Sequence, residues 1–266
     1  MRCRPQDARA LPVRPSEVTG RSEGVGGPDF GRRAATYDVL RPTADNWWEV
    51  YDALVREGDL NGRRVLDVGC GTGRFAAALS QRAKVWAVDP SQEMLEVARA
   101  RAPEVRFKQA SADALPFKDG WFERATMWLV VHLVDRPRVY GEIRRVLASS
   151  GRIAVVTFDP SYFGLFWFRG YFPSMEEIDR ARFPTRENFE AELGAAGFGA
   201  PGFTRISQRA AVTREVALER IRGKHISTFD LISDEEFRAG VERAERELPE
   251  LVDYRQEWLI AVAETV

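Results

Sequence analysis

Apolar and polar positions along this chain follow two alternating patterns. Short, nearly continuous apolar runs predict buried strands, and longer stretches with apolar residues three or four positions apart predict helices. The predicted strands are residues 63–69, 84–89, 105–112, 123–131, 151–158, 203–213 and 257–264. The predicted helices are residues 73–83, 91–102, 136–150 and 185–198. Because the early strands are apolar on both faces, we expect helices on both sides of the sheet. The pattern therefore predicts an α/β fold with a doubly wound, seven-stranded, mostly parallel sheet.

The ends and two internal segments depart from this alternation. Residues 1–29 are rich in Arg, Pro and Gly, lack the apolar core of a signal peptide, and are predicted to be a disordered extension. Residues 30–266 are predicted to form one domain, which begins with two helical pieces separated at Arg41–Pro42. The aromatic segment 158–184 and the helical segment 214–250 interrupt the strand–helix rhythm, and we interpret them as a lid and a cap insertion.

A glycine cluster follows the first predicted strand, in "VLDVGCGTGRF". Ligands of open α/β sheets bind beyond the carboxyl ends of the strands, so this loop is the first place to expect a site. Gly69 and Gly71 fit the dinucleotide fingerprint G-x-G-x-x-G, but Arg74 occupies the third glycine position and glycine falls one residue early, at Gly73. Asp67 adds a negative charge that disfavours a pyrophosphate. The loop therefore favours a cationic or zwitterionic ligand.

Asp89 ends the second predicted strand, about 20 residues further on, where an acidic residue accepts hydrogen bonds from ribose hydroxyls. The expected ligand thus has a ribose, a positive centre and no phosphate near the loop. S-adenosylmethionine, with its sulfonium, has all three properties. Helix capping is the alternative for Asp89, although Ser91 is the better-placed cap.

Four motifs together resemble the class I S-adenosylmethionine-dependent methyltransferases. They are "VLDVGCGTG", "VWAVDPSQEML", "ASADALPFKDGWFE" and "LVVHLVDRPRVYGEIRRVLASSGRIAVVTF". Their order and spacing are similar to those of the small-molecule type, which includes quinone-biosynthesis and trans-aconitate methyltransferase-like enzymes. The resemblance implies an enzyme that transfers a methyl group from S-adenosylmethionine to a small-molecule acceptor, which we expect to be apolar or aromatic. A non-catalytic cofactor-binding regulator or scaffold is the alternative.

The resemblance also implies roles for individual residues. The implied cofactor-binding residues are Tyr37, Arg41, Asp67, Gly69, Gly71, Gly73, Asp89, Pro90, Ser91, Met94, Ala112, Asp113 and Met127. Asp67 and the glycines would meet the methionine part, Asp113 the adenine amino group, and Met127 the sulfonium. Tyr37 and Arg41 would fold over the methionine end, with Arg41 pairing with the carboxylate. A turn role for Asp113 and simple packing of Tyr37 and Arg41 are the alternatives.

Catalytic candidates are few, because the chain has two histidines. His132 follows the fourth predicted strand, and His225 lies in the cap insertion, so either is a candidate general base. The alternatives are a helix-start role for His132 and a packing role for His225. The aromatic stretch "FDPSYFGLFWFRGYFP" follows the fifth strand. It is interpreted as an apolar lid over the acceptor, with a packed core segment or a homodimer contact as the alternative.

Composition and charge bear on three further questions: binding of nucleic acid, contact with membranes, and the cellular compartment. The net charge is −1 and the pI about 6.3, so no global field attracts nucleic acid or a membrane surface. The motifs of nucleic-acid methyltransferases after strand four are missing. Two cysteines, Cys3 and Cys70, predict no disulfide and a reducing, cytoplasmic location. No apolar run is long enough to span a bilayer, and no metal-ligand cluster is found in the sequence.

Overall fold

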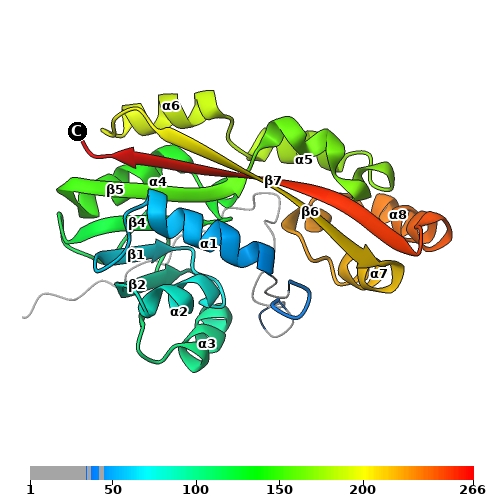
Figure 1. Ribbon diagram of the computed structural model, residues 1–266, viewed down its shortest axis with the longest axis horizontal. Coiled ribbons are helices and arrows are strands. Elements are labelled where there is room, and N and C mark those ends of the chain that lie inside the picture. Colours follow the sequence, from blue (N-terminus) through cyan, green and yellow to red (C-terminus); the bar gives the residue numbers. More distant parts are fainter. Residues whose placement is uncertain (1–33, 35–36, 42–44) are drawn as a thin grey trace, which may run out of the picture.

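A computed structural model describes residues 34, 37–41 and 45–266 of the chain. Its centre is a seven-stranded sheet with the order β3-β2-β1-β4-β5-β7-β6 (Figure 1). All neighbouring strands are parallel except β7, which runs antiparallel to both β5 and β6. This confirms the predicted doubly wound, mostly parallel sheet. The predicted extension 1–29 lies outside the described residues.

The strands and helices follow the predicted order. The strands are β1 (Arg64–Val68), β2 (Lys84–Asp89), β3 (Arg106–Gln109), β4 (Phe122–Trp128), β5 (Leu147–Phe158), β6 (Gly202–Thr213) and β7 (Leu251–Glu264). The α-helices are α1 (Asp45–Glu57), α2 (Arg74–Ser80), α3 (Gln92–Arg101), α4 (Arg136–Val146), α5 (Met175–Arg182), α6 (Arg186–Ala195), α7 (Arg214–Arg222) and α8 (Asp234–Glu247). Short 3₁₀ helices are η2 (Val131–Leu133), η3 (Pro160–Leu165), η4 (Trp167–Gly170) and η5 (Ser227–Asp230).

Helices bury an apolar stripe on each face of the sheet. On one face, Leu54 of α1 and Phe75 of α2 pack with Val65 and Val156. On the other face, Tyr140 and Ile143 of α4 and Phe189 of α6 pack with Leu66 and Val155. Consecutive residues of a strand point to opposite faces, so one strand supplies both clusters. The two clusters fix the sheet between its helical layers.

Several predicted boundaries are wrong. Residues 147–150 were expected to end a helix, but they begin β5. Strand β4 ends at Trp128 rather than at residue 131, and Val131 already belongs to η2. Strand β7 begins at Leu251, six residues earlier than predicted. In the predicted first helical piece, the described residues 37–41 form turns and a bend.

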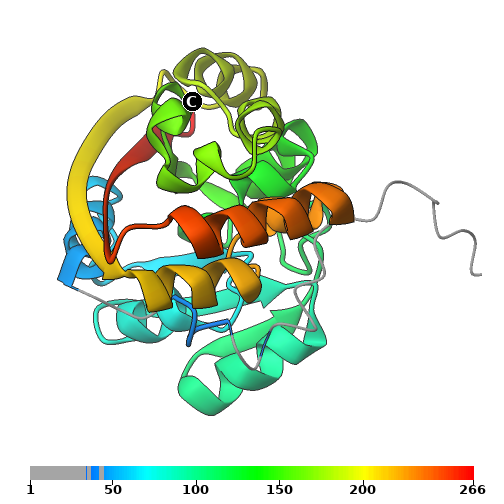
Figure 2. The ribbon, with the colours of Figure 1, turned by 90° about the vertical axis from the view of Figure 1, so that its right-hand side faces the viewer.

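The strands β6 and β7 extend beyond the rest of the sheet as a two-stranded arm. β5 pairs with β7 only from Trp258 to Glu264, whereas Leu251–Glu257 pair with β6 alone. Helices α7 and α8 are inserted between these strands and lie at the far end of the arm (Figures 1 and 2). A third apolar cluster joins them to η4 and α5, through Phe172, Ile221 and Phe229 among others. We call α7, η5 and α8 the cap, and η3, η4 and α5 the aromatic lid segment.

This arrangement places the cap at the carboxyl end of the sheet. Successive strands are added toward one edge of the sheet from β1 to β3 and toward the other edge from β4 onward, so the strand order reverses between the neighbouring strands β1 and β4. Such a switch point leaves a crevice beyond the strands, where ligands of α/β proteins bind. None of the helices in the described residues has the length and apolar character needed to span a membrane.

Candidate functional site

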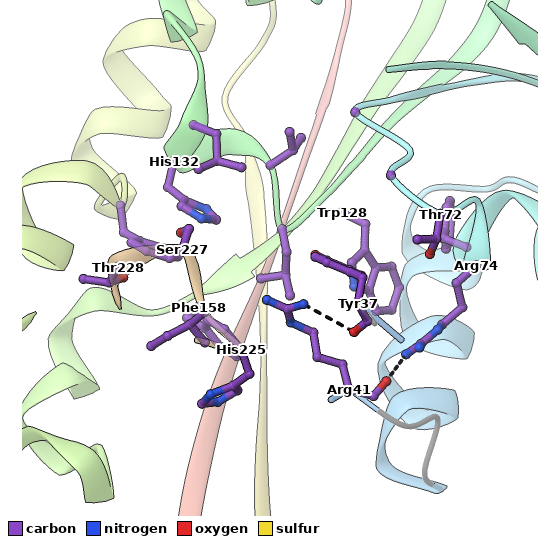
Figure 3. A pocket seen from close by; sticks show the side chains of 18 of the residues that line it. Tyr37, Arg41, Thr72, Arg74, Trp128, His132, Phe158, His225, Ser227 and Thr228 are labelled. Atoms are coloured by element: carbon purple, nitrogen blue, oxygen red, sulfur yellow. Dashed lines mark hydrogen bonds between the residues drawn. The ribbon is translucent and has the colours of Figure 1, made fainter. Parts of the chain in front are cut away.

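A cavity of about 1420 Å³ lies beyond the carboxyl ends of β1, β2, β4 and β5. Residues 37–41, the aromatic lid segment and the cap complete its walls. In Figure 3, Thr72 and Arg74 lie on one side of the cavity, and His132, Ser227 and Thr228 lie on the opposite side. We call these sides the loop half and the lid half.

The three glycines of the loop have different roles. All have a positive φ, which side chains disfavour. A Cβ atom on Gly71 would meet no atom within 4 Å, and Gly71 lines the cavity. A Cβ on Gly69 would lie 2.4 Å from Val130, and one on Gly73 would lie 2.8 Å from Ala98. Gly69 also lines the cavity. Gly73 is not among the lining residues and lets α2 pack closely against α3, and its cofactor role stays a prediction.

Asp67 is a buried carboxylate at the base of the loop half. Asp67 is only 1% exposed, and Thr126 donates a 3.1 Å hydrogen bond to its Oδ1. The other oxygen, Oδ2, has no hydrogen-bond partner among the described residues. Burial, with a smaller contribution from the charge of Asp89, raises the pKa of Asp67 to about 7. Since a buried polar atom is costly when unpaired, Asp67 is prepared for a cationic or hydrogen-donating ligand.

Asp89 organises the second edge of the same half. The N–H of Gly71 donates to Oδ2 at 2.8 Å, and the N–H of Ser91 donates to Oδ1 at 2.9 Å. Ser91 itself caps α3 by accepting from the N–H of Met94 at 3.2 Å. Burial raises the pKa of Asp89, and the two backbone donors oppose this rise. A carboxylate oxygen has further lone pairs, so Asp89 is held in place and can still accept from ribose hydroxyls.

Five further residues of the predicted cofactor site lie on the cavity wall. Pro90, Ser91, Met94, Ala112 and Asp113 all line the cavity. Asp113 is exposed and accepts a hydrogen bond from Ser111, so it has both a turn contact and a place on the cavity wall.

Met127 is not among the residues that line the cavity, and its contact with the sulfonium stays a prediction. Its side chain is fully buried in the cluster below α4. The next residue, Trp128, lines the cavity. Strand alternation explains the difference, because neighbouring residues of β4 face opposite sides of the sheet.

Residues 37–41 cross the mouth of the cavity. The guanidinium of Arg41 lies 3.8 Å from the centre of the Tyr37 ring and donates to the Tyr37 carbonyl at 3.4 Å (Figure 3). Both side chains line the cavity, so they pack on each other within the wall that they form. On the cap side, a Cβ on Gly223 would lie 2.6 Å from Leu40, which shows that this segment also packs tightly against the end of α7.

Arg74 fastens that segment to the loop half, a role that sequence reasoning missed. It donates to Oδ1 of Asp38 at 2.7 Å and to the carbonyl of Arg41 at 2.5 Å. Thr72 donates to the same Asp38 oxygen at 3.0 Å, and Arg101 pairs with the other one. In the sequence, Arg74 was notable only because it replaced an expected glycine. No spacing rule connects it with Asp38, which precedes it by 36 residues.

The two histidines both line the lid half of the cavity. The His132 ring stacks on Phe183 at 4.0 Å, and its Nδ1 is buried without a partner among the described residues. Burial and the charge of Arg182 lower the pKa of His132 to about 3, so its imidazole is a weak base. Nδ1 of His225 lies 3.0 Å from the carbonyl of Arg220, which can only accept, so Nδ1 carries the hydrogen. The catalytic roles of both stay predictions.

The aromatic stretch divides between wall and packing. Phe158, Phe166, Trp167 and Phe168 line the cavity. Phe163 and Phe172 are almost completely buried, Phe163 against Phe183 and Phe172 against Phe229 of the cap. Together with Phe183 and Trp258, the lining rings give the lid half an aromatic surface.

Four polar side chains that the sequence did not single out also line the lid half: Asp179, Arg182, Ser227 and Thr228. Arg182 donates to Ser227 at 2.9 Å and to Thr228 at 3.4 Å, and lies 3.6 Å from Asp179. Thr228 donates to Asp179 at 2.6 Å. These contacts join α5 to η5, so the cluster connects the lid segment with the cap. No short motif relates residues so distant in sequence.

Comparison with known proteins agrees with this geometry. Residues 65–151 match a family model described as a methyltransferase domain. A demethylmenaquinone methyltransferase of Thermus thermophilus is 35% identical over 204 residues, which cover 64% of this chain and 90% of the relative.

Two solved structures share the fold. The YcgJ protein of Bacillus subtilis has a TM-score of 0.59 at 21% identity, over 82% of this chain and 98% of that one. Phosphoethanolamine N-methyltransferase 2 of Haemonchus contortus, solved in complex with S-adenosyl-L-methionine, has a TM-score of 0.57 at 18% identity, over 88% of this chain and 57% of that one.

Proposed function

Because the chain belongs to the class I S-adenosylmethionine-dependent methyltransferases, we propose that it methylates a small, largely apolar molecule held in the lid half of the cavity. The cofactor of the family, S-adenosylmethionine, supplies an activated methyl group on its sulfonium. The residues of this chain bind the two reactants, align them and exclude water.

The loop half fits such a cofactor. The unpaired Oδ2 of Asp67 is suited to the ammonium of the methionine part, and the bare backbone at Gly71 gives that part room. Asp89, fixed by two backbone N–H groups, is suited to the ribose hydroxyls. Ala112, Asp113, Pro90 and Met94 then border the adenine. This division of roles is part of the proposal.

The observation that carries the acceptor class is the aromatic wall of the lid half. Phe158, Phe166, Trp167 and Trp258 line the same cavity as the glycine loop. An apolar acceptor would bury its surface there and displace water from the reacting atoms. Holding both reactants in one orientation is the main task of a displacement, and it contributes up to about 7–11 kcal/mol. With His132 a weak base, we propose that positioning outweighs proton abstraction by His132.

A radiolabel assay tests this proposal. The purified chain is incubated with labelled S-adenosylmethionine and a panel of small apolar and aromatic acceptors, beginning with demethylmenaquinone, the compound in the relative's name. We expect transfer to at least one of them. Trp167→Ala should raise KM for that acceptor by about tenfold and leave KM for the cofactor within about twofold, because Trp167 lines only the lid half.

Trp121→Ala is the matched control, since Trp121 packs edge-on against Trp86 and is not among the residues that line the cavity. Equal changes in both KM values would favour a packing role for Trp167. Binding of the cofactor with no transfer to any acceptor would favour the non-catalytic alternative, which the comparisons do not support. Absence of nucleic acid, a homodimer and a cytoplasmic location remain predictions from the sequence.

A further inference from the structure

We propose that the acceptor carries an anionic oxygen, a carboxylate or an ionised hydroxyl, and that Arg182 binds it. This inference rests on the proposed function, because it concerns the acceptor of that reaction. It assigns a polar anchor to a half of the cavity whose other walls are mainly aromatic.

Arg182 is fixed at the carboxyl end of α5. Its side chain is 17% exposed and lines the cavity. Ser227 and Thr228, from the cap, accept hydrogen bonds from its two terminal nitrogens. Its own carbonyl accepts a 3.0 Å hydrogen bond from Arg136. The guanidinium is therefore held in one orientation on the wall before any acceptor arrives.

The contacts of Arg182 leave its charge poorly compensated. Its hydrogen bonds go to two neutral hydroxyls, and the nearest carboxylate oxygen, on Asp179, is 3.6 Å away and also accepts from Thr228. Arg136 shows the contrast, since it binds both oxygens of Glu192 at 2.7 and 2.8 Å. A guanidinium with five N–H donors favours two-point contact with an oxyanion. Arg136 has such a partner, and Arg182 faces the cavity instead.

The groups around Arg182 favour an anion over a cation. His132 lies within range of its charge, stays neutral and has a buried Nδ1 without a partner among the described residues. Burial raises the pKa of Asp179 to about 6, and the charge of Arg182 opposes that rise. Arg220 also lines the cavity and donates to the Tyr254 hydroxyl at 3.4 Å. Arg255 lines it too, but it pairs with the buried Glu257. The positive charges that favour an anion here are therefore those of Arg182 and Arg220.

The anchor also orients the acceptor. Ser227 and Thr228 lie across the cavity from Thr72 and Arg74 (Figure 3). An acceptor whose oxyanion sits on Arg182 extends its apolar body along Phe158, Phe166 and Phe183, between the anchor and the loop half. The same contact ties α5 to the cap, because the partners of Arg182 belong to η5. The proposed anchor therefore lies where the lid segment meets the cap.

Two probes that differ in charge and by one methyl group test the proposal. Binding of 2-naphthoate and of its neutral methyl ester is measured by calorimetry on the full chain saturated with S-adenosylhomocysteine. We expect the wild type to prefer the anion by at least about tenfold, the range that one charge-assisted contact supplies. Arg182→Met should remove that preference and change the affinity for the ester by less than about threefold. Arg182→Lys should retain part of it, since it keeps the charge but loses the two-point geometry.

Arg180→Gln is the control, because Arg180 lies on the same helix, is 44% exposed and pairs with Glu176 outside the cavity wall. It should leave the preference unchanged. A wild type without preference for the anion, whether it binds both probes or neither, overturns the proposal, and so does a folded Arg182→Met variant that keeps the preference. If Arg182→Met does not fold, the wild type and Arg182→Lys decide. Failure to bind S-adenosylhomocysteine would instead contradict the proposed function.

Discussion

At the scale of single residues, Asp67 affects stability and binding in opposite directions. Burial raises its pKa in the folded protein to about 7, above the value of about 4 in an unfolded chain. The folded state therefore holds the proton more tightly, and its free energy of unfolding falls as pH rises from about 4 to about 7. A ligand ammonium, in contrast, needs the ionised carboxylate. The charge destabilises the empty protein, and under the proposed function it binds the cofactor ammonium.

Cofactor affinity should consequently depend on pH. With a pKa of about 7 in the free protein, Asp67 is mostly ionised at pH 8 and mostly protonated at pH 6, so affinity for S-adenosylhomocysteine should be about tenfold weaker at pH 6. Calorimetry at both pH values, in buffers of different ionisation enthalpy, should show proton release on binding near pH 7.

Asp67→Asn provides the control for this prediction. It should bind weakly at both pH values, with a much smaller pH dependence, and should unfold at a higher temperature than the wild type at pH 8. Burial also raises the pKa of Asp89, so the comparison must allow for the titration of this second carboxyl group. An unchanged pH profile in a folded Asp67→Asn variant would assign the titration to Asp89 instead.

At the scale of elements, residues 37–41 act as a strap between the loop half and the cap. Arg74 holds one side through Asp38 and the Arg41 carbonyl, and Leu40 packs on Gly223 at the other. Arg74→Met should therefore leave the sheet folded and release S-adenosylhomocysteine about tenfold faster, because a largely buried charge-assisted contact is lost. Stopped-flow tryptophan fluorescence measures the rate, and hydrogen exchange should show loss of protection at residues 37–41.

Arg82→Met is the control for the strap, since it also removes an Arg–Asp ion pair, the more exposed pair of Arg82 with Asp52, away from the cavity. It should leave the release rate unchanged. If Arg74→Met also left the rate unchanged, the strap would not limit cofactor release.

The element scale also shows how far the sequence could predict the structure. Apolar runs located β1, β2, β4 and β5, because burial on both faces leaves a strong local signal. β3 and β6 were located as well, although most of their residues are partly or fully exposed. The ends of the strands were harder to predict. Leu251–Glu257 belong to β7 because they pair with β6, and the local pattern of apolar and polar residues does not show this pairing. At the site, loop spacing predicted Asp67 and Asp89 as wall residues. Arg74, Arg182 and Thr228 act through partners far away in sequence, and the orientation of Met127 depends on the sheet register.

At the scale of the whole molecule, the arm formed by β6 and β7 joins the sheet to the cap. β7 contributes Ile260 to the sheet core and Val252 to the cap cluster. β6 likewise contributes Ile206 to the sheet core, and its Val212 packs against the cap cluster. The cavity takes walls from both parts. Although the cap has an apolar cluster of its own, it cannot unfold alone without disturbing strands that complete the sheet. We therefore expect one cooperative unit rather than two.

Scanning calorimetry tests this expectation. The chain should unfold in a single transition, with agreement between the calorimetric and van't Hoff enthalpies. S-adenosylhomocysteine at 100 times its Kd should stabilise the folded state by about 2.7 kcal/mol and raise Tm by about 5–10 °C. The strap and the Arg182 cluster extend this effect to the cap, so hydrogen exchange should show ligand protection in α7 as well as in the glycine loop. Two transitions, of which the ligand shifts only one, would mean that the cap is an independent unit and that the arm does not transmit stability.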